Sequence, residues 1–266
     1  MSAGGEPRSP APLGLRRLVA ANAPLWAGEA AVFRAYWDAP MRTRESDLAW
    51  LARQCRKELF DGVLPRMQAF DALARRLGSE RDRNELTALA DGVQTETAHF
   101  QAFANVYDQW RPPADPPLDA VRLAQSEWPE NLALAALRAR HRAEHGVFGR
   151  RAEAFTEGGY CTLYTAGCSL AGRGGIDDAI AAACARVVDD EWEHMIAGVA
   201  GFGGEPFSDE DWALLTTLTV EQGRCRIRMR QAQFGGPLGP AELRRAENGG
   251  FPPLPFDFER AGFAAP

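Results

Sequence analysis

The segment ETAH at residues 96–99 has the same form as EWEH at residues 191–194, and this repetition decides the predicted fold. In each segment, here called an E-x-x-H motif, a glutamate precedes a histidine by three residues. On an α-helix such residues project from nearly the same face, so both side chains can reach one point. Two of the four histidines of the chain stand in this arrangement. The spacing therefore predicts two helices that each present one glutamate–histidine pair.

Both motifs interrupt apolar stripes at helical spacing, so we expect them to be buried. Burying a carboxylate without a partner costs several kcal/mol, and a divalent cation shared by the two helices would satisfy all four side chains. Carboxylates and imidazoles suit iron or manganese, and no thiolate here favours zinc or copper. The stripes comprise Leu86, Leu89, Val93, Phe100 and Phe103 around the first motif, and Ile180, Cys184, Val187, Val188, Met195 and Gly198 around the second.

Two further helices should each supply one carboxylate to the metals. Glu58 lies 38 residues before Glu96, which is enough for a helix to run down, turn and return. Asp61 is a weaker candidate because it is turned aside from the stripe that carries Glu58, which also includes Leu48, Leu51, Cys55 and Gly62. For the second motif we favour Glu157 on hairpin geometry. Glu153 remains the alternative, because it precedes the glutamate of that motif by the same 38 residues.

Helical periodicity dominates the chain and predicts an all-α fold. Four prolines between residues 110 and 119 should form a crossover without a helix. Two long hairpins joined by a long connection are the layout of a ferritin-like four-helix bundle, here with extra flanking helices and extended terminal tails. We expect a disordered lead-in over residues 1–20, the bundle domain over 21–235 and an extended tail over 236–266. The expected helices cover residues 28–37, 46–77, 80–107, 128–167, 176–199 and 208–234, the last capped by Ser208.

The ordered set of Glu58, the first motif, Glu157 and the second motif resembles the ligand pattern of the ferritin-like di-iron carboxylate superfamily. The resemblance spans residues 58–194. It implies two iron ions bridged by Glu96 and Glu191, each also bound by one histidine (His99 or His194) and one terminal glutamate. Manganese fits the same ligands. It further implies O2 or peroxide chemistry. Tyr160 and Tyr164 follow Glu157 at helical spacing, where they would form hydrogen bonds to the metal ligands or carry a redox step; the alternative is that they are buried tyrosines with other polar partners.

The leading functional hypothesis is a non-haem di-iron oxidase or oxygenase that oxidises a small organic substrate, in a biosynthetic pathway and with an external electron donor. The alternatives are an iron-binding or storage protein, a peroxide dismutase similar to manganese catalase, and a helical interaction protein without metal. Storage needs only a compact bundle, whereas this chain has additional helices. Five cysteines without a C-x-x-C pair exclude a rubredoxin-type iron site.

Charge and hydropathy narrow the partners and the location. A net charge of −6 disfavours nucleic acid, including tRNA, as a partner. We expect no membrane span, because no run of about 18 apolar residues occurs. The N-terminus lacks the apolar stretch of a signal peptide, and the cysteines suit small core residues in a reducing cytoplasm. A homodimer is compatible with these features.

Two other groups of charged residues are expected to be solvated. His141 and His145 lie one turn apart among arginines and glutamates, which favours an exposed face over a metal site. Alternating arginines in a later helix should likewise spread around a solvated helix; they are Arg224, Arg226, Arg228 and Arg230.

Overall fold

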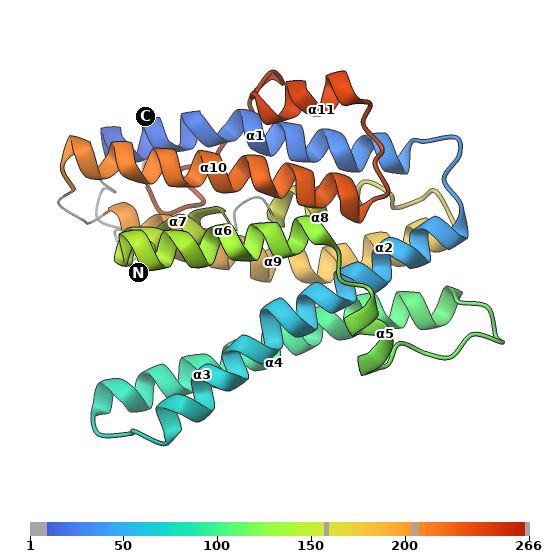
Figure 1. Cartoon of the computed structure of the whole chain (residues 1–266), viewed down its shortest axis with the longest axis horizontal. Helices are drawn as coiled ribbons and strands as arrows, with labels where there is room; N and C mark the ends of the chain where they lie inside the picture. The colour runs from blue at the N-terminus through green and yellow to red at the C-terminus, as the bar shows by residue number, and fades with distance from the viewer. Residues whose placement is uncertain (1–9, 157–159, 204–206, 264–266) are drawn as a thin grey trace, which may run out of the picture. The chain divides into compact units, whose positions relative to one another are not determined.

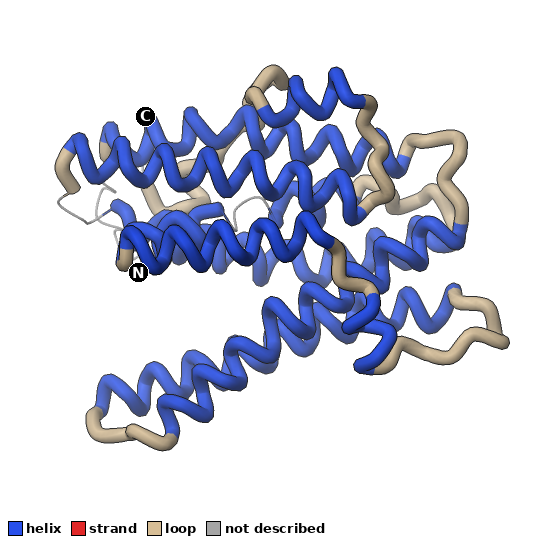
Figure 2. The backbone as a smooth tube through the Cα atoms, viewed as in Figure 1, coloured by secondary structure: helices blue, strands red, loops and turns tan. Residues whose placement is uncertain are grey.

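The computed structural model describes residues 10–156, 160–203 and 207–263, and in these ranges the chain folds into helices joined by loops (Figures 1 and 2). No strand occurs in the described part, which confirms the all-α prediction. The helices are α1 (Leu13–Trp37), α2 (Arg44–Arg56), the π-helix η1 (Lys57–Val63), α3 (Leu64–Ala74), α4 (Glu80–Trp110), α5 (Ala120–Gln125), α6 (Pro129–His145), α7 (Val147–Thr156), α8 (Tyr160–Cys168), α9 (Ile176–Gly203), α10 (Asp209–Gln233) and α11 (Pro240–Glu247).

The chain divides into two compact units. Unit 1 comprises Met1–Ala39, Trp128–Ala166 and Val188–Pro266, and unit 2 comprises Pro40–Glu127 and Gly167–Val187. The single bundle domain over residues 21–235, and with it the four-helix ferritin-like architecture, stays a prediction.

In unit 1, α10 packs along α1 and also contacts α6, α7 and α11. The α1–α10 interface is apolar at one end, where Leu15 and Leu18 of α1 share a core with Leu215 of α10. Farther along, the two helices bury charge: Glu29 of α1 forms ion pairs with Arg226 at 2.7 Å and Arg230 at 3.2 Å. The expectation of a solvated α10 is therefore wrong on this face.

The same alternation of arginines places the other two on the outside of α10. Arg228 forms an exposed ion pair with Glu247 of α11, and Arg224 donates to the backbone oxygen of that residue. On a helix, residues i and i+4 share a face, so Arg226 and Arg230 are buried together while Arg224 and Arg228 face α11. The two buried arginines, Arg226 and Arg230, share the carboxylate of Glu29. The alternating sequence pattern alone does not indicate this partner.

His141 is a second correction, because it is buried rather than solvated. Its Nε2 lies 3.0 Å from an oxygen of Glu221, and the side-chain amide of Gln222 donates to its Nδ1 at 3.1 Å. These contacts fix the ring between α6 and α10. His145, one turn later, is partly exposed, as expected for a solvated face.

The predicted terminal tails also differ from the structure. Residues 13–20 were expected to be disordered, yet α1 begins at Leu13, because Leu15 and Leu18 bury fully against α10 and outweigh the cost of Pro24 inside the helix. Part of the expected extended tail forms α11, whose Ala246 packs against α1. The other expected helices are found with shifted bounds; the one over residues 128–167 forms as α6, α7 and α8.

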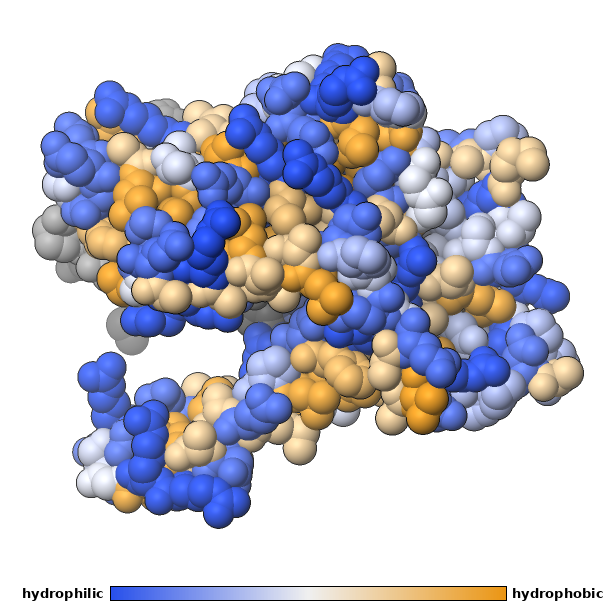
Figure 3. Space-filling model, viewed as in Figure 1, coloured by the Kyte–Doolittle hydropathy of each residue, from blue (hydrophilic) through white to orange (hydrophobic). Residues whose placement is uncertain are grey.

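In unit 2, α2, η1 and α3 form one continuous helical run, and α4 returns antiparallel to it after the turn at residues 75–79 (Figure 1). The turn ends in a capping box in which Ser79 and Asp82 satisfy each other's backbone N–H groups. Trp50 of α2 and Phe103 of α4 pack edge-to-face between the two helices, with ring centroids 6.5 Å apart. Side chains on α3 and the start of α4 are mostly hydrophilic at the surface, with some hydrophobic residues between them (Figure 3). No helix in the described ranges is long and apolar enough to cross a membrane.

Candidate metal centre

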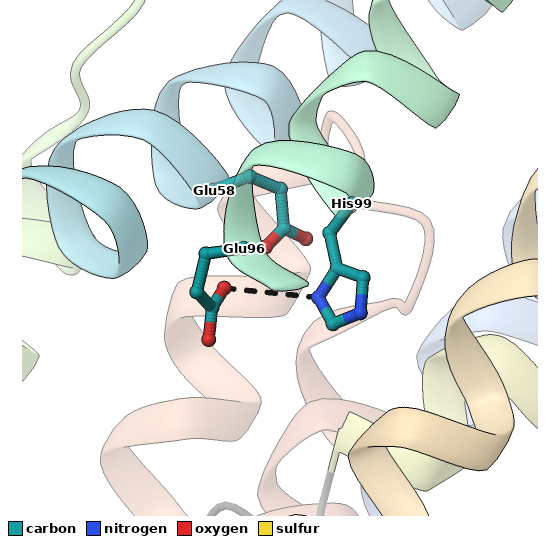
Figure 4. A group of neighbouring side chains, drawn as sticks. All are labelled: Glu58, Glu96 and His99. Atoms are coloured by element: carbon teal, nitrogen blue, oxygen red, sulfur yellow. Dashed lines mark ion pairs between the residues drawn. The ribbon is translucent and has the colours of Figure 1, made fainter. Parts of the chain in front are cut away.

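The antiparallel run in unit 2 brings together three side chains that the sequence predicts as metal ligands. Glu58 extends from η1, while Glu96 and His99 extend from α4, and the three point toward one another (Figure 4). One ligand atom from each residue lies within 4.8 Å of the other two. All three residues are buried, with exposed fractions of 5%, 5% and 0%. Among the described residues this set is a candidate for binding one metal ion.

A π-helix carries Glu58, the first of these candidate ligands. In η1 the hydrogen bonds run from i to i+5, which adds one residue to a turn and shifts every following side chain around the axis. The predicted stripe remains buried through this change, since Leu51, Cys55 and Gly62 are buried together with Glu58. Gly62 lies directly against Glu96: a Cβ at this position would be 2.6 Å from Oε2 of Glu96. The absence of a side chain here lets the two helices approach at the centre.

Each carboxylate of the centre has one oxygen bound by a second side chain. The amide of Gln54, one turn before Glu58, donates to Oε1 of Glu58 at 2.5 Å. Nη2 of Arg66 lies 2.9 Å from Oε1 of Glu96. In both cases the neighbouring group orients the carboxylate, as residues around metal ligands commonly do.

The distances suit a divalent metal ion. Nδ1 of His99 lies 3.7 Å from Oε2 of Glu96, the pair joined by the dashed line in Figure 4. Two ligand atoms at about 2.1 Å from one ion are roughly 3 to 4.2 Å apart, depending on the angle between them. This pair already has such a spacing. The remaining separations are within 4.8 Å, and any that exceeds about 4.2 Å has to shorten when an ion binds.

Thiols also lie close to the centre, but their chemistry differs from that of its ligands. Burial raises the pKa of Cys55 and of Cys184, and the negative charge of Glu58 raises both further. Both are free cysteines. The neutral thiol is a poor metal ligand, because the thiolate is the form that binds. The donors offered are therefore two carboxylates and an imidazole, which fit iron or manganese.

The predicted ligands from the second half of the chain belong to unit 1. Glu191 lies on α9 and is buried, as expected. His194 lies on the same helix, but its side chain is outside the described part, as is all of Glu157. Tyr164 of α8 is fully buried, and the side chain of Tyr160 is outside the described part. The second metal thus stays a sequence prediction.

The two alternative carboxylates have other partners. Glu153 of α7 forms ion pairs with Arg142 and, at 3.9 Å, with Arg138. Asp61 of η1 is exposed and lies 3.1 Å from Arg56 and 3.3 Å from Lys57. The exposed position of Asp61 agrees with the prediction that this residue is turned aside from the stripe that carries Glu58.

Two residues that contact the carboxylates of the centre were missed by sequence reasoning: Gln54 and Arg66. The signal for Gln54 was available, since it precedes Glu58 by one turn of the same helix. Arg66 had no such signal, because its contact with Glu96 depends on the rotation that η1 introduces before α3 begins.

Comparisons with protein-family models, curated proteins and solved structures found no match to this chain.

Proposed function

We propose that this chain is a non-haem di-iron oxidase or oxygenase of ferritin-like fold, which activates O2 to oxidise a small organic substrate. Glu58, Glu96 and His99 would bind the first iron. The second E-x-x-H motif and Glu157 would bind the second iron, as the sequence pattern predicts. Manganese is the alternative metal for the same donors.

One observation carries the proposal: two carboxylates and an imidazole from two antiparallel segments converge in the interior of unit 2. Two buried negative charges repel each other and lose their hydration, which costs several kcal/mol. Arg66 and Gln54 each reach one of the carboxylates, and a divalent cation would balance the rest of the negative charge. The types of donor atom and their spacing fit a metal site better than they fit an ion pair with a purely structural role.

When bound, a ferrous pair supplies the two electrons that begin the reduction of O2. For a hydroxylation the balance is one O2, two electrons from an external donor and two protons, giving the hydroxylated product and one water. In this balance the protein residues have to keep bulk water out and hold the ligands. The burial of Glu58 and His99 on η1 and α4 supports both tasks.

The reaction of the reduced protein with O2 tests the proposal. Protein loaded with Fe2+ without oxygen should consume O2 on mixing and show a transient visible absorption band. The His99→Ala variant should behave as buffer with the same iron concentration. O2 consumption by the wild type that does not exceed that of free Fe2+ would sink the enzyme proposal.

Iron loading separates the two classes of ferritin-like protein. An oxidase or oxygenase should stop at about two irons per chain, whereas a storage protein continues to take up iron after its first sites are filled. Disproportionation of H2O2 by Mn2+-loaded protein, without O2 activation by the Fe2+ form, would instead favour the peroxide dismutase.

We place the enzyme in the cytoplasm, which the free thiols Cys55 and Cys184 support.

A further inference from the structure

We propose that Arg66 is a positioning residue for Glu96, and that it directs this carboxylate to bind metal through Oε2 alone. The inference rests on the proposed metal centre and deepens it. It departs from the resemblance, which implies that Glu96 bridges two metals with both of its oxygens.

Arg66 reaches the centre from the first turn of α3. Its Nη2 lies 2.9 Å from Oε1 of Glu96, and its Nη1 donates to the backbone oxygen of Gly62 at 3.2 Å. The guanidinium thus spans η1 and α4 at the level of the ligands. Its side chain is 30% exposed, whereas that of Glu96 is 7% exposed, so Arg66 covers the carboxylate from the solvent side.

A glycine on α4 makes room for this arginine. A Cβ at Gly92 would lie 3.1 Å from both Cδ and Nε of Arg66, so the arginine stem crosses the helix directly over this residue. Gly62, on the opposite helix, similarly leaves room for Oε2 of Glu96. The guanidinium and the carboxylate are therefore confined from two sides, which restricts rotation of the Glu96 side chain.

The two oxygens of Glu96 consequently have separate environments. Oε1 is engaged by the guanidinium of Arg66. Oε2 faces Nδ1 of His99 at 3.7 Å, the spacing expected of two ligands on one ion. A metal bound there would share Glu96 with Arg66, so Glu96 would act as a terminal ligand whose orientation the arginine sets.

Substitution of Arg66, with Mn2+ as the probe, tests this role. Binding is measured from the electron paramagnetic resonance signal of free Mn2+, in the full chain and without O2 or substrate. Arg66→Gln should weaken Mn2+ binding about 10- to 100-fold, the usual effect of losing a group that orients a metal ligand. Arg66→Lys keeps the charge but not the fork of donors, so it should restore part of the affinity.

The matched control is Arg75→Gln, which removes an exposed arginine of the same hairpin that pairs with Asp71 and should leave binding unchanged. A double-mutant cycle adds specificity: in a Glu96→Ala background, Arg66→Gln should have no further effect. Unchanged or tighter Mn2+ binding in Arg66→Gln would overturn the positioning role while leaving the metal centre intact. A wild type that binds no Mn2+ or Fe2+ would overturn both proposals. Thermal unfolding of each variant shows that it is folded.

Discussion

Replacement of Gly62 by alanine tests the close packing at the centre, because helix propensity and steric fit predict opposite effects. Alanine in place of glycine inside a helix stabilises it by about 1 kcal/mol. At Gly62, however, the new Cβ would lie 2.6 Å from Oε2 and 3.1 Å from Cδ of Glu96. Since ordinary contacts begin near 3.4 Å, the carboxylate has to retreat by about 0.8 Å.

Forcing extra atoms into a packed interior costs about 1 to 3 kcal/mol. After the gain in helix propensity, Gly62→Ala should leave the metal-free protein between unchanged and about 2 kcal/mol less stable. The displaced carboxylate should also weaken Mn2+ binding at least about tenfold, because metal ligands need placement to within roughly 0.5 Å.

Gly92→Ala is the matched control on the facing helix. Its Cβ would meet only the flexible side chain of Arg66, at 3.1 Å, so the gain in helix propensity should dominate and raise stability by up to about 1 kcal/mol. Urea unfolding followed by circular dichroism, in the presence of a chelator, measures both variants. Equal stabilisation by the two alanines would refute the packing that we describe between Gly62 and Glu96.

Three further predictions address other parts of the chain. Glu29→Gln should destabilise the protein by about 3 to 5 kcal/mol in urea unfolding, because it leaves two buried arginines without their carboxylate. Arg228→Gln, which removes one partner of an exposed ion pair, should cost at most about 1 kcal/mol. Similar losses of stability in the two variants would contradict the assignment of buried and exposed faces on α10. Burial raises the pKa of the Cys184 thiol above its ordinary 9.0. As the pH rises above 9, the thiol therefore ionises in the unfolded chain before it ionises in the folded chain. The free energy of unfolding should then fall by up to about 1.4 kcal/mol per pH unit from this thiol, with the full stability present below pH 9. Cys184→Ala should make the stability profile between pH 8 and pH 10 flatter, and an unchanged slope would refute the contribution. Gln54→Leu should weaken Mn2+ binding about tenfold through loss of its hydrogen bond to Glu58, and full affinity would show that this amide does not orient the ligand.

The proximity of Glu58, Glu96 and His99 could be predicted from sequence because its signals are local. The i, i+3 spacing of Glu96 and His99 places both on one helical face, and the separation of 38 residues from Glu58 fits a hairpin with a short turn. These signals depend only on helix geometry and chain length. The structure brings all three residues together in unit 2.

Other features depend on contacts that no spacing rule contains. The π-helical turn of η1 shifts the register before α3, so the approach of Arg66 to Glu96 cannot be read from a regular helical period. His141 is expected to be solvated because its neighbours in sequence are charged, yet Glu221 and Gln222 of α10 contact the ring, which is buried. The start of α1 was missed because Pro24 weakens the local signal, which burial against α10 then overrides.

Iron content is the measurement that tests the central claim most directly. The wild type, His99→Ala and His145→Ala are purified without oxygen, loaded with Fe2+ and desalted, and their iron is then determined. His145 is the matched control, because it is a partly exposed histidine on α6. The wild type and His145→Ala should retain about two irons per chain, and His99→Ala should lose most of its iron. A wild type without iron, or a His99→Ala variant that retains the full amount, would contradict the assignment of Glu58, Glu96 and His99 as a metal centre.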